Sequence, residues 1–150
     1  MALGDINPCE APGVFAFGLL SSAIATNSPP AGASAGLAMS IVRAGLGGGL
    51  PDQMTLIIRS TAGSGTMTVT CRLWGYYTVA ADWFPLGTGT GATSGVINVA
   101  TALTEAGADV LRHAEPIYTP AHFSRLYLEI TAIGGTSTAI TAELVGKVIA

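Results

Sequence analysis

The sequence predicts an all-β protein: an antiparallel β-sandwich, jelly-roll-like, with an extended N-terminal arm and at most one short helix. Two observations carry this prediction. Residues 53–77 and 123–149 contain stretches in which apolar and polar side chains alternate, as in strands with one buried face. Short segments rich in Gly, Thr and Ser separate these stretches, as turns separate strands. A chain of 150 residues has the size of one domain with a two-layer core.

The N-terminal third of the chain differs in character from the rest. It carries few charges and contains turn-forming pairs such as Pro12-Gly13. Residues 14–17 are compatible with a strand, and residues 37–46 (LAMSIVRAGL) with either a short helix or a strand. We therefore expect residues 1–50 to form an arm or an irregular first layer, packed on the domain or on a neighbouring molecule. Residues 51–150 are expected to form the β-sandwich.

Residues 53–77 are expected to form the first hairpin. Residues 53–60 (QMTLIIRS) are rich in β-branched side chains, and residues 66–77 (TMTVTCRLWGYY) begin with strict alternation. The apolar face of the second strand carries Met67, Val69, Cys71 and Leu73. Residues 61–65, which are Gly-rich, have the length of a hairpin loop.

The middle of the chain is less regular. Short strands are expected at residues 77–81 and 96–99, and a flexible loop at residues 87–95 (GTGTGATSG). Residues 101–112 are the best helix candidate, because a threonine can cap the start and acidic residues would give a polar face. Gly107 weakens this helix.

Residues 123–149 are expected to form the second hairpin, with a turn at residues 134–136. One face of its first strand carries Leu126, Leu128 and Ile130. The matching face of its second strand carries Ile140, Ala142, Leu144 and Gly146. Both faces are expected to point into the core.

Composition limits the functions to consider. Charged residues make up 10% of the chain, against about 25% in an ordinary domain, and the net charge is −3. The six basic residues are scattered, which disfavours direct binding of nucleic acid. No apolar run has the length of a membrane-spanning helix, and no basic segment precedes an apolar one near the N-terminus. We expect a protein that is made and used without export, with no membrane partner.

The residue types needed for catalysis or metal binding are present but poorly arranged. His113, Glu115 and His122 form the only cluster of metal-ligand types, and their spacing matches no helical zinc motif. Cys9 and Cys71 lie far apart and do not make a disulfide framework; Cys71 is expected to be a buried thiol. We therefore predict no catalytic, cofactor or metal site, and no enzyme.

Aromatic side chains are the more promising feature. Trp74, Tyr76 and Trp83 lie close in sequence on strand-like segments. Aromatic rings on a β-face can stack on sugars, close one end of a core or anchor a protein interface. We favour packing or an interface. The candidate interface residues are Phe15, Phe17, Trp74, Tyr76, Trp83, His113 and His122.

Three segments resemble those of small virion proteins of tailed bacteriophages. They are RLWGYY at residues 72–77, WFPLG at residues 83–87, and RLYLEIT…GGTSTAITAELV within residues 125–145. The chain is most similar to β-sandwich capsid decoration (cement) proteins, over roughly its C-terminal two-thirds. The resemblance is one of overall style and composition, so it assigns no role to an individual residue.

This resemblance implies a structural subunit that binds the lattice of the major capsid protein and stabilises the phage head. It implies a dimer or trimer on the capsid surface of the virion, assembled in the host cytoplasm. A tail or head–tail connector component remains an alternative. So do a carbohydrate-binding β-sandwich that uses Trp74, Tyr76 and Trp83, and a small hydrolase or metal enzyme that uses the two histidines and Glu115.

Overall fold

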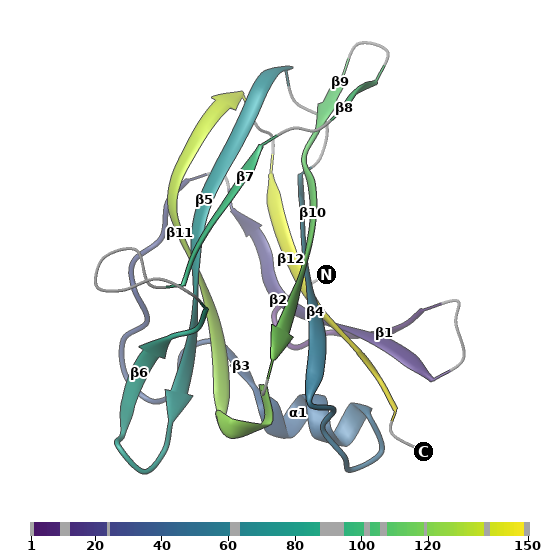
Figure 1. Cartoon of the computed structure of the whole chain (residues 1–150), viewed down its shortest axis with the longest axis vertical. Coiled ribbons are helices and arrows are strands. Elements are labelled where there is room, and N and C mark those ends of the chain that lie inside the picture. Colours follow the sequence, from purple (N-terminus) through teal and green to yellow (C-terminus); the bar gives the residue numbers. More distant parts are fainter. Residues whose placement is uncertain are drawn as a thin grey trace.

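Two antiparallel sheets face each other across one apolar core, as the computed structural model shows (Figure 1). The structure describes residues 2–9, 13–23, 25–60, 64–87, 95–100, 103–105, 108–118, 120–136 and 139–148. The first sheet contains, in spatial order, β1 (Ile6–Pro8), β2 (Val14–Ala23), β12 (Ile140–Lys147), β4 (Gln53–Ser60) and β10 (Arg112–Tyr118). The second contains β3 (Leu37–Ala38), β11 (Arg125–Thr136) and β5 (Ser64–Tyr77), followed by β6 (Asp82–Pro85) and β7 (Val96–Ala100), which both pair with the far edge of β5.

The order of the strands is that of a jelly roll. Without the short strands β1 and β6, the first sheet reads β2-β12-β4-β10 and the second β3-β11-β5-β7. The separate two-stranded pair of β8 (Leu103–Glu105) and β9 (Ala108–Val110) is also left out, so eight strands remain. Numbered along the chain from one to eight, their orders are 1-8-3-6 and 2-7-4-5. This is the double Greek key of jelly-roll sandwiches. The fold class predicted from the sequence is therefore confirmed.

The two expected hairpins are not hairpins. β4 pairs with β12 and β10 in the first sheet, whereas β5 pairs with β11, β6 and β7 in the second. β11 and β12 likewise lie in opposite sheets. Alternation indicates which face of a strand is apolar. It does not indicate the pairing, because two strands in opposite sheets that face each other across a core have the same alternating sequence as two strands paired in one sheet. The chain therefore crosses between sheets where a hairpin turn was expected.

The N-terminal segment is an integral part of the sandwich, which corrects the expectation of an extended arm. β2 lies between β1 and β12, and Phe17 in its centre is fully buried. The chain then passes to the second sheet, forms β3 and continues as the helix α1 (Met39–Gly45). The ambiguous residues 37–46 thus begin as a strand and end as a helix. The low charge and small side chains of this segment suit a buried strand.

Two further predictions in the middle of the chain were wrong. The helix expected at residues 101–112 is replaced by the short paired strands β8 (Leu103–Glu105) and β9 (Ala108–Val110), followed by the start of β10. The strand expected at residues 77–81 is mostly the turn between β5 and β6. The strand expected at residues 96–99 is confirmed by β7. Most of the loop expected at residues 87–95 lies outside the described residues.

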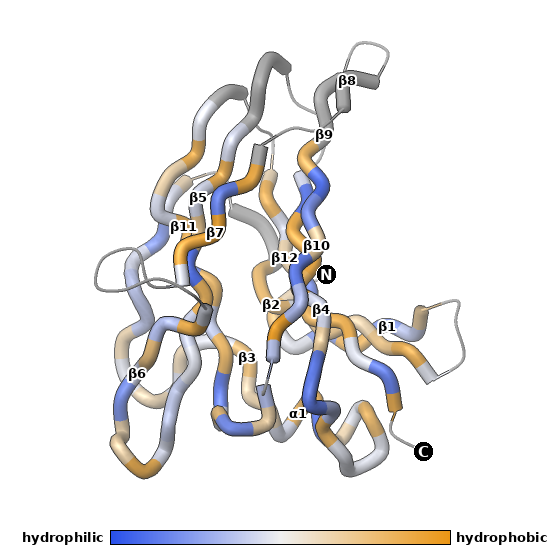
Figure 2. Tube along the Cα trace, in the orientation of Figure 1, coloured by the Kyte–Doolittle hydropathy of each residue, from blue (hydrophilic) through white to orange (hydrophobic). Residues whose placement is uncertain are grey.

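The core lies between the sheets and extends to α1, whose Met39 and Val42 belong to it. The predicted inward faces are confirmed at Val69, Cys71, Leu73, Leu126, Leu128, Ile130, Ile140, Ala142 and Leu144, all of which are buried. Figure 2 shows polar and apolar residues interspersed along β10. Within the described part of the chain, no helix is long and apolar enough to cross a membrane.

Candidate functional site

An aromatic cluster lies on the outward-facing side of the second sheet. Tyr76 of β5 is paired with Trp83 of β6, and their ring centroids are 5.2 Å apart in an edge-to-face arrangement. Trp83 makes a second edge-to-face contact, at 6.2 Å, with Tyr127 of β11. Three strands thus bring together two of the three aromatic residues that the sequence singled out, Tyr76 and Trp83, and one that it did not, Tyr127. We call Tyr76, Trp83 and Tyr127 the aromatic cluster.

The polar ends of two of these rings bind the connection between β2 and β3. The indole Nε1 of Trp83 donates a hydrogen bond to the Gly32 carbonyl at 3.0 Å, and the Tyr127 hydroxyl donates to the Ser28 carbonyl at 2.9 Å. We call this connection, residues 25–36, the strap. The aromatic cluster is therefore a brace for the strap rather than an open platform for stacking a ligand.

The strap also occupies the edge of β11 beyond its short pairing with β3. The backbone N–H of Asn27 donates to the Ile130 carbonyl at 3.1 Å, and the side-chain Nδ2 of Asn27 donates to the Leu128 carbonyl at 3.2 Å. The Asn27 Oδ1 accepts a hydrogen bond from the Ile130 N–H at 2.6 Å. One asparagine thus satisfies backbone groups that a further strand would otherwise pair. Covering an edge in this way prevents unwanted strand addition.

Arg125 fixes the end of the strap. Its Nε donates to the Ala35 carbonyl at 2.6 Å, and its Nη2 donates to the carbonyls of Ser34 and Gly36 at 2.8 and 2.9 Å. The guanidinium is thus held by neutral carbonyl oxygens, which leave its positive charge in place.

Trp74 lies beside the aromatic cluster in a polar setting. Its Nε1 donates to the carboxylate of Glu129 at 2.8 Å, and the guanidinium of Arg72 lies 5.5 Å from its ring centroid. Arg72 and Glu129 are direct cross-strand partners, and Glu129 is 7% exposed. Burial, and secondarily the charge of Glu129, raises the pKa of Tyr127. Opposite charges and a cation–π contact therefore hold Trp74 in one position.

An exposed apolar patch lies at the turn between β5 and β6. It consists of Tyr77, Val79 and Phe84, and we call it the apolar tip. Val79 is 83% exposed, and the Tyr77 and Phe84 rings meet edge to face at 6.3 Å. Figure 2 shows apolar colour at this turn, which projects from one end of the sandwich (Figure 1). A shallow hollow beside it is lined in part by the same two rings, together with His122 and Phe123.

The remaining candidate interface residues do not join these features. Phe17 is fully buried, so the interface role expected for it is corrected, whereas Phe15 is only partly buried and packs against the core. Their inward direction follows from the position of β2 inside the first sheet. His113 contacts Glu115 at 3.0 Å on β10, whereas His122 lies in the 3₁₀ turn Pro120–His122 and lines a different hollow.

No group of three or more metal-ligand side chains occurs among the residues that the structure describes. His113, Glu115 and His122 are thus not brought together as a ligand set.

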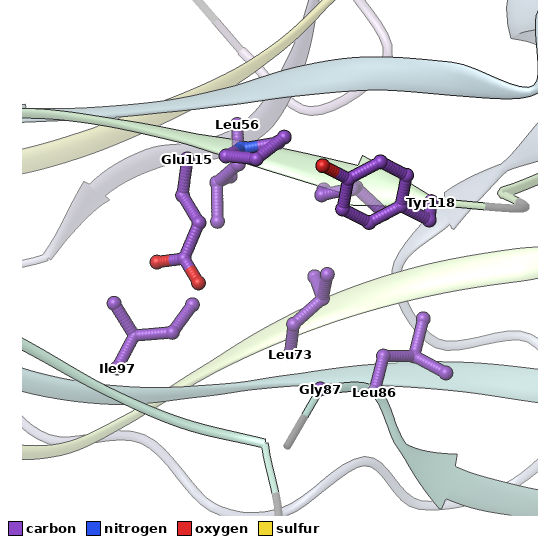
Figure 3. A pocket seen from close by; sticks show the side chains of 9 residues that line it. Leu56, Leu73, Leu86, Gly87, Ile97, Glu115 and Tyr118 are labelled. Carbon is purple, nitrogen blue, oxygen red and sulfur yellow. The ribbon is translucent and has the colours of Figure 1, made fainter.

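A small cavity of about 130 Å³ lies between the sheets where β10 faces β5 and β7. Figure 3 shows the Glu115 carboxylate among apolar side chains that include Leu56, Leu73 and Ile97. A carboxylate pointing inward from an edge strand discourages pairing of that edge with another chain. Among the described lining residues, Glu115 and Tyr118 alone carry titratable side chains, and the Glu115 carboxylate is in contact with His113.

The Cys71 thiol is expected to be inert in the folded protein. Burial, and secondarily the charge of Glu115, raises its pKa from 9.0 to about 12. A thiol-specific disulfide reagent at pH 8 should therefore modify one thiol per folded chain, that of the half-buried Cys9, and two in urea. The variant Cys9→Ser should show no fast reaction. Rapid modification of Cys71 in this variant would contradict its burial.

The raised pKa also has a consequence for stability. The pKa of Cys71 is higher in the folded than in the unfolded state, so its contribution to the free energy of unfolding is complete below pH 9.0. This contribution is lost as the pH rises to about 12.

Comparison with known proteins adds no further assignment. No family model matches this chain, and no curated protein or solved structure is detectably similar to it. Function must therefore be inferred from the fold, the surface and the contacts.

Proposed function

We propose that this protein is a structural virion subunit that binds the lattice of the major capsid protein and stabilises the phage head, without catalytic activity. Jelly-roll sandwiches are a recurrent architecture of viral capsid domains. The fold alone does not assign function, since lectins and cupins share it. The surface supports the structural role: charged residues are only 10% of the chain, so copies repel each other weakly.

The apolar tip is the observation that carries this proposal. Large side chains are exposed together at Tyr77, Val79 and Phe84, on a hairpin that projects from the sandwich. A contiguous apolar patch on a protein of low charge is typical of a protein–protein contact. A hairpin of this kind fits a depression on a neighbouring subunit.

We further propose that the protein acts as a dimer or trimer on the capsid surface, assembled in the host cytoplasm. Repetition by symmetry turns individually weak contacts into stable attachment, because a linked copy rebinds at high effective concentration. A tail or head–tail connector component would use the same chemistry at another place in the virion.

A carbohydrate-binding module is the second candidate, because aromatic residues gather on the outward face of the second sheet. Two observations weigh against it. The rings of the aromatic cluster meet edge to face, and the polar ends of Trp83 and Tyr127 are bound to the strap. Sugar stacking needs an exposed ring face.

The test uses capsid shells assembled from the major capsid protein encoded in the same genome. The wild-type chain should be a dimer or trimer by mass and should cosediment with the shells. Val79→Asp should weaken cosedimentation at least about tenfold, because a charge would be placed in an apolar contact. Its thermal unfolding should be almost unchanged, since Val79 is 83% exposed.

The matched control is Leu3→Asp, which places the same charge on an exposed residue of the turn before β1. It should cosediment like the wild type. A wild-type chain that stays monomeric and ignores the shells would overturn the proposed function. Equal losses in the two variants would deny a specific role to the apolar tip.

A further inference from the structure

A groove of about 570 Å³ lies next to the apolar tip. It runs between α1, the end of β5 and the turn that leads into β11, and we call it the end groove. These elements lie together at one end of the sandwich, in the lower part of Figure 1. The lining includes Arg43 of α1, Tyr76 of β5, and His122 and Arg125 on either side of the turn.

The end groove concentrates positive charge in an acidic protein. The chain has six Lys and Arg residues and a net charge of −3, yet Arg43 and Arg125 both line this groove. The described lining residues include no Asp or Glu. Elsewhere, Arg59 forms an ion pair with Glu143, and Arg72 lies across from Glu129. Basic side chains without an acidic neighbour attract a negatively charged ligand.

The side chains of the two arginines in the groove differ in how firmly they are held. The side chain of Arg43 is exposed, and within the described part of the chain it has no hydrogen bond or ion pair. Arg125 is held rigidly by the three carbonyls of the strap, which leave its charge uncompensated. A fixed cation loses little conformational freedom when a carboxylate binds, and a flexible one can adjust to it.

The groove is also partly apolar. Met39 and Phe123 line it, and Phe123 and His122 also line the hollow beside the apolar tip. Hydroxyl groups of Ser40, Thr78 and Ser124 lie along the same groove. A ligand that fills both hollows needs carboxylates and apolar side chains on one flexible backbone, which describes a peptide segment.

We propose that the end groove binds an acidic segment of a partner protein, in which Asp or Glu alternates with apolar residues. Its carboxylates lie near Arg43, Arg125 and His122, and its apolar side chains enter the hollow beside the apolar tip. The identification of the partner as another virion protein rests on the proposed function. A nucleic acid fits less well, because no basic track continues from the groove and the net charge is −3.

The experiment measures binding of a labelled 12-residue peptide, of alternating Glu and Leu or Phe, to the full chain by fluorescence anisotropy. The control peptide has Gln in place of Glu, and a single-stranded oligonucleotide tests the phosphate alternative. The wild-type chain should bind the acidic peptide at least about tenfold more tightly than either. Added salt should weaken the binding.

Arg43→Glu should weaken binding of the acidic peptide at least about tenfold. Lys147→Glu makes the same change in net charge at an exposed residue of β12, and should bind like the wild type. Arg43→Gln provides a milder variant should the first unfold. Equal binding of the two peptides, equal losses in the Arg43 and Lys147 variants, or tighter binding of the oligonucleotide would overturn the inference. Failure of the wild-type chain to bind shells would overturn the proposed function alone, and the peptide result would stand.

Discussion

Replacing Phe17 by Ala should lower the free energy of unfolding by about 3–5 kcal/mol. Phe17 is fully buried in β2, and its ring lies so close to Gly45 that a Cβ on this glycine would collide with it. Truncation therefore removes apolar contacts with β2's own sheet and with α1, and leaves a cavity that the close-packed helix can fill only in part. Urea unfolding, followed by tryptophan fluorescence, measures the loss.

The control is Phe84→Ala, which removes the same group from the apolar tip. Because Phe84 is 44% exposed, this change should cost less than about 1 kcal/mol. If Phe17→Ala does not fold, Phe17→Leu keeps most of the buried volume and should show a smaller loss of about 1–2 kcal/mol. A loss near zero in both Phe17 variants would mean that β2 is not part of the core.

Replacing Gly36 by Ala should be the next most damaging change. Gly36 ends the strap with a φ of +70°, in the left-handed region, and an added Cβ would overlap the Leu126 carbonyl oxygen. Backbone strain accounts for about 1–2 kcal/mol of the expected loss. The collision requires β11 or the strap to shift, so the total loss should exceed about 3 kcal/mol.

Gly32 provides a matched control for this prediction. Its φ is +72°, but an added Cβ would meet no atom within 4 Å. Gly32→Ala should therefore show the strain alone, about 1–2 kcal/mol. The difference between the two variants, measured by denaturant unfolding, isolates the contact between the strap and β11. Equal losses would show that Gly36 does not lie against this strand.

The faces of the long strands were predictable, but their partners were not. Alternation correctly assigned Leu73, Leu128 and Leu144 to the core, because the period of two is a property of each strand alone. Pairing is decided by loop paths and by the packing of complete sheets, which no local pattern records. For the same reason, residues 1–50 were expected to form an arm or an irregular first layer, although β2 pairs with both β1 and β12 in the first sheet.

The candidate site was predictable in part for a similar reason. Trp74, Tyr76 and Trp83 are close in sequence, and the structure places all three on the outward side of the second sheet. The strap was missed, since its hydrogen bonds to β11 join residues about a hundred positions apart, such as Asn27 and Ile130. Its sequence, with consecutive prolines, indicates only an extended connection.

The position of β12 has a consequence for how the chain folds. β12 is the last strand in sequence, yet it lies between β2 and β4 and pairs Leu144 with Phe17. Neither β2 nor β4 can form its backbone hydrogen bonds to β12 until β12 has been synthesised. The nascent chain therefore leaves the ribosome with apolar strands that are not yet paired. Topologies dominated by such distant pairings fold slowly, over milliseconds to seconds. Protection of the nascent chain from aggregation during this interval is therefore a requirement of the fold.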